Sequence, residues 1–504
     1  MSIYLVSTIL IIYFLVLLII SYFTSQSDSN DSFFVGDRKS PWYVVAFGMI
    51  GASLSGITFI SIPGSVAKYS KELGLIPADQ FGYMQMVFGY FIGYLVVALV
   101  LLPIYYKMNL TSIYTYLEKR FGYWSYKTGS AFFLISRLIG ASIRLLLVSS
   151  VLQLILFDEI GIPFEFTVIG SVLLIWVYTN KGGIKTIIWT DTLQTFFMLT
   201  AVVFTVYLIS DFLELNEKGG VIKEINKSEF SKIFFFEDWY SANYFWKHFL
   251  GGIFITIGMT GLDQDMMQKN LSCKNLKSAQ INMITFAGIL IIVNLIFLTL
   301  GALLFMYFNQ TGIGANVLDI PNPRTDLLFA EIAKNGTLGL GLGVLFLLGL
   351  IAAAYSSADS ALTSLTTSFS IDFLEIDKKP LESQKKTRKN AHLLMSVILI
   401  LLIIFLRNFS NDSAIWMLIK LAGFTYGPLI GLFFFGILTT RDLIDKWVPI
   451  VCTLIPLFIA IIWMIHTKGI IDWFGNYQFG AELIIYNVAA SLLALFLISK
   501  KVKS

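Results

Sequence analysis

Apolar residues 42–69 are interrupted by the run Gly51-Ala52-Ser53-Leu54-Ser55-Gly56-Ile57-Thr58, and Pro63-Gly64 follows in the same stretch. Each glycine lowers helix stability by about 1 kcal/mol, and serine competes for hydrogen bonds of its own backbone. The run therefore predicts a helix that unwinds in its middle. Unwinding exposes carbonyl and hydroxyl oxygens, which are suitable ligands for a small hard cation. Close helix packing through small residues is the alternative explanation of the same run.

The interrupted stretch is one of a series of long apolar segments along the chain. Of 504 residues, 56% are hydrophobic and only 13% are charged, which is unusual for a soluble domain. A helix needs about 20 apolar residues to cross ~30 Å of hydrocarbon, and only helices satisfy their own backbone groups in such segments. We predict an all-α polytopic membrane protein with about thirteen transmembrane helices, at residues 3–23, 42–69, 81–106, 128–157, 163–179, 185–213, 244–268, 278–308, 337–373, 391–407, 413–438, 447–466 and 482–499.

Lysines and arginines indicate the cytoplasmic side of these spans. They gather in the connections after odd-numbered spans and in the tail 500–503, whereas the other connections hold few apart from 214–243. The positive-inside rule then places the N-terminus outside and the C-terminus in the cytoplasm, in a plasma (inner) membrane. A wrong number of spans would scatter these charges evenly. The lipid bilayer is therefore an expected partner of the chain.

The same composition excludes other classes of function. The net charge of +4 comes from loop lysines and does not indicate a nucleic-acid partner, and no obligatory protein partner is evident. Cys273 and Cys452 have no spacing that predicts a disulfide framework or a metal site. The chain contains no Walker A, HExxH or GxSxG motif. We expect neither an ATP-driven pump nor an enzyme.

The predicted ninth span carries a second polar interruption. At about 100° per residue, one face of this helix collects Ala353, Ser356, Ser357 and Ser360, with Asp359 beside them. Small-residue packing explains the alanines, but it does not explain a carboxylate in the membrane, which is costly and marks function by default. Stacked hydroxyls next to a carboxylate suit sodium better than a soft metal.

Few other charges lie inside the predicted spans. Asp191 follows the start of the sixth span, and Arg137 and Arg144 share a face of the fourth. The arginines could neutralise Asp191 or Asp359, or they could bind a substrate carboxylate with two hydrogen bonds. Asp263 and Asp265 stand near the end of the seventh span, where helix capping or contact with solvent is the simpler interpretation.

These polar segments resemble those of the sodium:solute symporter family, which includes sodium/glucose, sodium/proline and sialic-acid transporters. The run from Ser53 to Pro63 is similar to the first core helix of that family. The similarity extends in order over nearly the whole chain, through the segments 111–121, 182–191, 263–268 and 353–360.

The resemblance implies a five-plus-five inverted repeat with a broken first core helix, in one transporter domain spanning residues 1–504. Residues 42–213 and 244–438 would be the two repeats, preceded by helix 3–23 and followed by two helices in 447–499. It also implies a sodium site formed by Gly51, Leu54, Ala353, Ser356 and Ser357. Some members bind a second cation, and the residues here would be Asp191, Ser356 and Ser360. Asp359 stands where those members usually have serine, so it could bind sodium, pair with an arginine or carry a proton.

The resemblance places the solute beside the unwound segment. Its candidate ligands are Ser53, Ser55, Thr58, Gln85, Arg137, Arg144, Thr425 and Tyr426. In sialic-acid transporters an arginine of the third core helix binds the solute carboxylate. The gap-free match here falls near Gly140, between Arg137 and Arg144.

We therefore predict a secondary active symporter that imports a small organic solute by alternating access, coupled to Na⁺. The solute would be a sugar, an acidic sugar such as sialic acid, or a related molecule. A proton-coupled carrier of the same fold, using Asp359 or Asp191, is the alternative within the class. A membrane sensor of the same fold is a second alternative.

Overall fold

The computed structural model describes residues 3–24, 29–70, 72–153, 157–158, 160–320, 323–408, 414–471 and 473–501. Residues 154–156 of the predicted fourth span, position 413 of the predicted eleventh span and residues 502–504, which include part of the basic tail, lie outside this set. The α-helices are α1 (Ile3–Thr24), α2 (Asn30–Val35), α3 (Trp42–Ser53), α4 (Gly56–Ser65), α5 (Tyr83–Val96), α6 (Leu102–Lys107), α7 (Thr115–Arg120), α8 (Tyr123–Leu152), α9 (Phe164–Phe212), α10 (Val221–Lys227), α11 (Phe245–Thr256), α12 (Gln264–Leu271), α13 (Leu276–Thr311), α14 (Ala315–Leu318), α15 (Leu328–Asn335), α16 (Leu340–Ser368), α17 (Leu381–Leu406), α18 (Ala414–Leu438), α19 (Val448–Thr467) and α20 (Leu483–Leu497).

Short elements complete the described chain. The π-helical turns are η2 (Val97–Leu101), η4 (Ile257–Gly261) and η6 (Phe369–Phe373), and the 3₁₀ turns are η1 (Gly36–Arg38), η5 (Thr325–Leu327), η7 (Ile376–Lys378) and η8 (Asp445–Trp447). Two small two-stranded antiparallel sheets pair β1 (Ala67–Ser70) with β2 (Gly74–Pro77) and β3 (Asp442–Leu443) with β4 (Ser499–Lys500).

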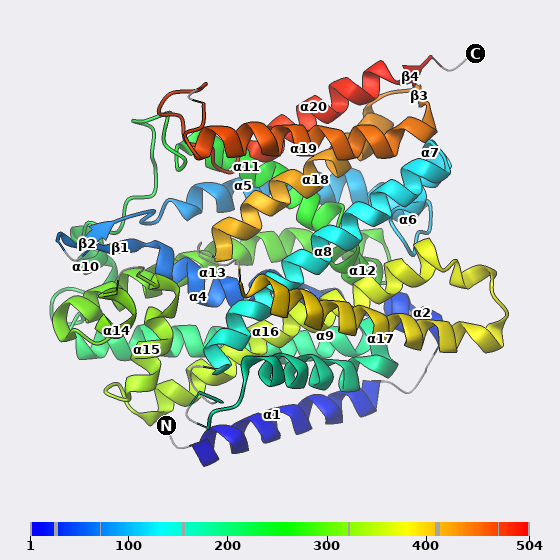
Figure 1. Ribbon diagram of the computed structural model, residues 1–504. Helices are drawn as coiled ribbons and strands as arrows, with labels where there is room; N and C mark the ends of the chain where they lie inside the picture. The colour runs from blue at the N-terminus through cyan, green and yellow to red at the C-terminus, as the bar shows by residue number, and fades with distance from the viewer. Residues whose placement is uncertain are drawn as a thin grey trace.

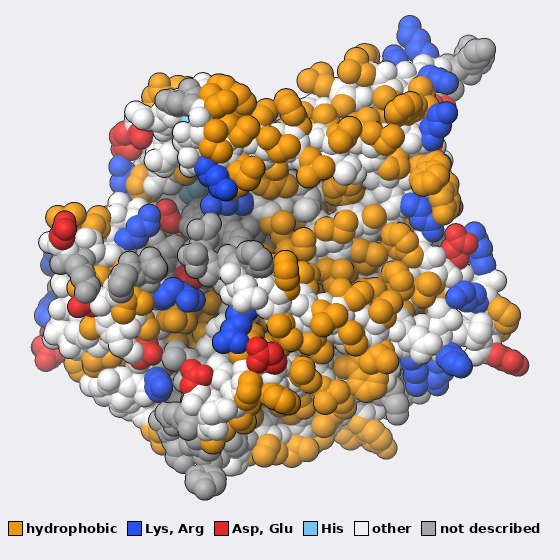
Figure 2. Space-filling view, in the orientation of Figure 1, with side chains coloured by type: hydrophobic (Ala, Val, Ile, Leu, Met, Phe, Trp, Pro, Cys, Tyr) orange, Lys and Arg blue, Asp and Glu red, His pale blue; other side chains and the backbone are white. Residues whose placement is uncertain are grey.

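The long helices form a bundle with an apolar belt. Most of them run from side to side in Figure 1, with α1 at the lower edge and α19 and α20 at the upper edge. Figure 2 shows a broad hydrophobic band across this face, whereas lysines, arginines and acidic residues gather at its left and right ends. Large apolar side chains such as Ile11 and Leu15 of α1 and Leu454 and Phe458 of α19 are exposed on the outer helices. A bilayer would cover such a belt, as the composition predicts.

The helices agree with the predicted class of fold, although the number of spans stays a prediction. By length and composition, eight helices of the described chain can cross a membrane, and the bent pair α3 and α4 makes a ninth. Shorter apolar helices cover Thr8–Thr24, Phe164–Asn180 and Leu483–Leu497. Because length alone does not separate a short span from a buried helix, thirteen remains a predicted number.

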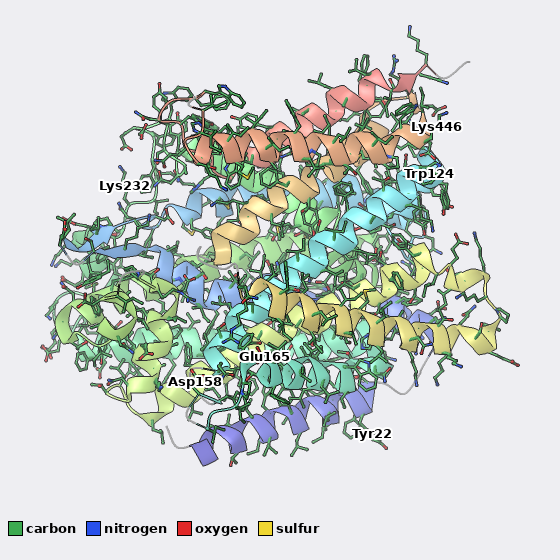
Figure 3. The ribbon with its side chains drawn as sticks, viewed as in Figure 1. Tyr22, Trp124, Asp158, Glu165, Lys232 and Lys446 are labelled. Atoms are coloured by element: carbon green, nitrogen blue, oxygen red, sulfur yellow. The ribbon has the colours of Figure 1, made fainter. Side chains whose placement is uncertain are left out.

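Labelled residues of three connections lie at the two opposite ends of the bundle (Figure 3). Figure 3 places Trp124 and Lys446 at the right end and Lys232 at the left. The right-hand pair belongs to connections that the sequence assigns to the cytoplasm. At that end the Asp445 carboxylate accepts hydrogen bonds from the amides of Trp124 (2.8 Å) and Ser125 (2.7 Å). This contact fixes the start of α8 against the turn before α19.

One glycine separates the predicted fifth and sixth spans. Gly183 has φ 51° and ψ −138° inside the continuous assignment of α9. A side chain at this position would be strained, and its Cβ would lie 2.6 Å from the ring of Phe33. The chain therefore breaks at Gly183, and Gly183–Phe212 forms a membrane-length helix of its own. That second helix carries Asp191 into the centre of the protein.

Candidate functional site

The predicted unwinding lies between α3 and α4. These helices meet at an angle of 57°, and the two residues between them leave helical conformation, with φ −84° and ψ 76° at Leu54 and φ −70° and ψ 175° at Ser55. Carbonyls at a helix end lose the amides that would follow them in an unbroken helix. The break thus presents backbone oxygens in the interior of the bundle, as the glycine and serine run predicts.

The break is also a point of close helix packing. The small residues at 51–58 therefore have both predicted roles, unwinding of the helix and close contact between helices. A Cβ on Gly51 would collide with the hydroxyl of Thr195 on α9, and a Cβ on Gly56 would lie 3.8 Å from the backbone of Ala354 on α16. Helices α3 and α4 therefore contact α9 and α16 directly. This contact brings the predicted carbonyl ligands Gly51 and Leu54 to the same part of the bundle as Ala353, Ser356 and Ser357.

Two buried hydroxyls near the break have no hydrogen-bond partner in the described part of the chain. They belong to Ser357 on α16 and Thr195 on α9, and both residues are almost fully buried. A buried polar group left unsatisfied costs about 1–3 kcal/mol. A sodium ion would satisfy such oxygens, together with the carbonyls at the break. The donor set therefore fits sodium, and Thr195 is a candidate that the sequence reasoning missed.

The predicted second cation site contains a lysine. Asp191 accepts a hydrogen bond from Ser356 (2.6 Å), and its other oxygen lies 2.8 Å from Nζ of Lys269. The ammonium also donates to Ser360 Oγ at 2.8 Å. Lys269 is 1% exposed. The sequence reasoning counted it among the cytoplasmic loop charges. The sequence held one signal that Lys269 could be buried in an ion pair. It follows Asp265 by four residues, and residues so spaced share a helix face.

Asp359 is buried but is satisfied by other partners. The hydroxyl of Tyr178 donates to its carboxylate at 2.8 Å, and the amide of Ser360 donates at 2.5 Å. Neither predicted arginine pairs with it. The structure thus places Asp359 beside the Asp191 cluster as a hydrogen-bond acceptor.

Arg137 has a different ion-pair partner from those considered in the sequence. Its guanidinium binds Asp265 and lies 4.0 Å from Asp263. Asp263 caps α12 by accepting from the amide of Asp265 (2.9 Å), which confirms the capping expectation. Contact with solvent was wrong for both aspartates, because they are 0% and 1% exposed. Burial follows from the bundle, which closes over the short helix α12.

A cavity of about 100 Å³ lies beside the break. Five predicted solute ligands line this cavity, namely Ser53, Ser55, Thr58, Arg137 and Arg144. Its other polar lining residues are Tyr83, Tyr90, Tyr94, Thr256 and Thr260. A smaller cavity of about 10 Å³ shares Arg137 and Arg144 and adds Thr425 and Tyr426. Two arginines therefore stand between these spaces, on the same face of α8.

Gln85 is not brought to this cavity. Its side-chain nitrogen donates to the carbonyl of Asn243 (2.9 Å) and its oxygen accepts from the amide of Phe235 (2.9 Å). These bonds tie α5 to the long connection before α11. Gln85 thus serves here as a buried anchor for that connection.

The two arginines differ in charge environment. Arg137 is neutralised by Asp265, whereas Arg144 forms no salt bridge in the described chain and its Nε has no hydrogen-bond partner. Arg144 is nevertheless 92% buried, with 8% of its surface exposed. A buried guanidinium that has no carboxylate partner in the described chain and lies beside a cavity can bind an anionic group there.

The sodium:solute symporter family model matches residues 33–442, which contain the break, both oxygen clusters and the cavity. The chain belongs to this family. It is a sodium-coupled symporter of a small organic solute, held in a membrane, and not an enzyme.

Relatives of this symporter are described with particular solutes. The chain is 28% identical over 437 residues to the sodium/sialic acid symporter NanT of Aliivibrio fischeri, covering 83% of this chain and 80% of that protein. It is also 28% identical to the sodium/sialic acid symporter SiaT of Proteus mirabilis, covering 84% and 82%. The sodium/glucose cotransporter of Vibrio parahaemolyticus is 26% identical, covering 68% of this chain and 63% of that protein.

A solved structure of a substrate-bound, outward-open Na⁺-coupled sialic acid symporter superposes over 100% of both chains, with a TM-score of 0.79 and 20% identity. This likeness shows the fold of the symporter, including the class of architecture that the sequence predicted.

Proposed function

We propose that the symporter imports a carboxylated solute of the acidic-sugar class, such as a sialic acid, on the sodium gradient. The observation that carries this proposal is Arg144, whose buried guanidinium lines the cavity and has no carboxylate partner among the residues that the structure describes. The names of the two bacterial relatives support the same class of solute.

Arg144 would bind the solute carboxylate. An arginine presents its donors in a planar fork that matches a carboxylate with two hydrogen bonds. Arg137 is unsuited to this role because Asp265 already neutralises it. The hydroxyls of Ser53, Ser55 and Thr58 line the same space and would bind sugar hydroxyls, and Thr425 and Tyr426 would contact the far end of a longer solute.

Sodium would bind at the break, to the carbonyls of Gly51, Leu54 and Ala353 and the hydroxyls of Ser356 and Ser357. The unpartnered Ser357 oxygen supports this assignment. A cation there links α3 and α4 to α16, so it would favour the state in which these elements are in contact. Coupling requires that sodium bind one conformation better than another, and this shared contact supplies the difference.

The proposed orientation in the membrane rests on the lysines and arginines of the connections between spans. We propose that the N-terminus lies outside and the C-terminus in the cytoplasm of the plasma membrane, with Trp124 and Lys446 on the cytoplasmic side. Residues 42–213 and 244–438 would form the two inverted halves, between helix 3–23 and the pair in 447–499.

Uptake into proteoliposomes tests the proposal. Radiolabelled N-acetylneuraminate would be supplied outside, with an inward gradient of sodium, of choline at the same pH, or of protons in sodium-free buffer. We expect accumulation only with sodium. Accumulation driven by protons alone would support the proton-coupled carrier instead, and sodium-driven uptake of glucose but not of the acidic sugar would refute the solute class.

A further inference from the structure

Lys269 lies where the second cation would bind. Its Nζ is 2.8 Å from Asp191 Oδ2 and 2.8 Å from Ser360 Oγ, and it is 4.0 Å from Asp265 Oδ1. These oxygens come from three separate elements, α9, α16 and α12. An ammonium group has three donors and no acceptor, so the oxygens around it all face a positive charge.

Two serines also contact the carboxylate of Asp191. Asp191 Oδ1 accepts the hydroxyl of Ser356 at 2.6 Å, and Ser360 Oγ lies 3.4 Å from Asp191 Oδ2. A sodium ion bound to Asp191 and Ser360 would have to displace the lysine. The displaced ammonium would then be buried without its partner, which is strongly unfavourable because Lys269 and Asp191 are 1% and 0% exposed.

We propose that Lys269 acts as a built-in cation that permanently fills the second cation position, so that the symporter binds a single sodium ion in each cycle. This inference rests on the proposed sodium site at the break. Asp191 and Ser360 then bind the lysine. Ser356 contacts both places, because its hydroxyl hydrogen is donated to Asp191 while its lone pairs can face the sodium ion proposed at the break.

The charge of the cycle follows from this assignment. A solute with one carboxylate and a single sodium ion together carry no net charge across the membrane. The lysine stays with the protein and contributes no cargo charge. Two sodium ions with the same solute would instead move one positive charge inward, which a negative-inside membrane potential would assist.

Sodium counting tests the inference without any solute. Equilibrium binding of ²²Na⁺ to the purified full-length protein in detergent should saturate at one ion per chain. The double variant Lys269→Gln/Asp359→Ser removes one cation and one anion together, so it keeps the net charge of the cluster. We expect it to bind two ions. Lys274→Gln removes an exposed lysine of the same segment and should still bind one.

The outcomes separate this inference from the proposed function. Two ions bound by the unchanged protein, or one ion bound by a folded double variant, would overturn the role of Lys269. No sodium bound by the unchanged protein would overturn the proposed sodium site itself. If the double variant does not fold, the count on the unchanged protein still decides, because one ion supports the inference and two ions refute it.

Discussion

The hydroxyl of Ser356 donates a 2.6 Å hydrogen bond to the carboxylate of Asp191. This bond joins α16 to α9 and turns the hydrogen of Ser356 away from the break. The oxygen lone pairs of Ser356 are then free to face a cation, and the negative charge of Asp191 strengthens them as ligands. A change at Asp191 is therefore expected to reach the sodium site through Ser356.

Ser357→Ala should abolish sodium-stimulated uptake while leaving the fold intact. The Ser357 hydroxyl is buried without a partner in the described chain, so its removal should not lower the free energy of unfolding of the sodium-free protein and should raise it by up to about 1–3 kcal/mol. Thermal unfolding with and without sodium is the measurement, because a ligand of the folded state raises its stability. The variant should lose the sodium-induced rise in Tm.

Ser364→Ala is the matched control for this prediction. Ser364 lies on the same helix and is equally buried, but its hydroxyl donates to the carbonyl of Ala361 at 3.0 Å. It should keep the sodium-induced rise. A Ser357→Ala protein that still responds to sodium would remove this residue from the site.

Asp191→Asn should destabilise the protein by roughly 3–5 kcal/mol, because it leaves the buried charge of Lys269 without its carboxylate. Adding Lys269→Gln should recover much of this loss, since the pair is then replaced by two neutral amides. Chemical or thermal denaturation of the two single variants and the double variant measures their coupling. Purely additive losses would show that the 2.8 Å pair contributes nothing to stability.

Arg144→Gln should weaken binding of an acidic sugar roughly 10-fold to 100-fold, the range for losing a hydrogen bond to a charged group. Sodium binding should persist, because Arg144 is not part of that donor set. Calorimetric titration of N-acetylneuraminate and ²²Na⁺ binding on the same preparation separate the two effects. Arg407→Gln, whose guanidinium is half exposed and pairs with Glu165 at 3.3 Å, should leave both unchanged.

Uptake of a solute with one carboxylate should be independent of membrane potential. One sodium ion balances its charge, so a potassium diffusion potential set with valinomycin should not change the initial rate into proteoliposomes. The dependence of the rate on sodium concentration should have a Hill coefficient of about 1. A negative-inside potential that accelerates uptake several-fold would contradict the single-ion cycle.

Local chemistry in the sequence was sufficient for the membrane class and the broken helix. Twenty-residue apolar segments leave no alternative to helices in a bilayer, and the glycines and serines at 51–58 mark the point where α3 ends and α4 begins. The burial of Asp191 and Asp359 was also predictable, since both lie inside apolar spans. These conclusions depend only on residue types and on spacing along one helix.

Tertiary packing alone decided which charges meet. Arg137 binds Asp265 on α12 and leaves Asp191 to Lys269, and Arg144 is left facing the cavity. Spacing along one helix predicts which residues share a face, but not which face of another helix comes opposite. In the sequence, Lys269 stands at the end of an apolar segment and was therefore interpreted as a loop charge. In the structure it is buried, because the bundle closes over α12. The apolar sequence by itself determined a membrane transporter with a broken helix. Only the packing of α9, α12 and α16 decided that Lys269 pairs with Asp191, because ion pairs form between whichever charges the folded chain buries together.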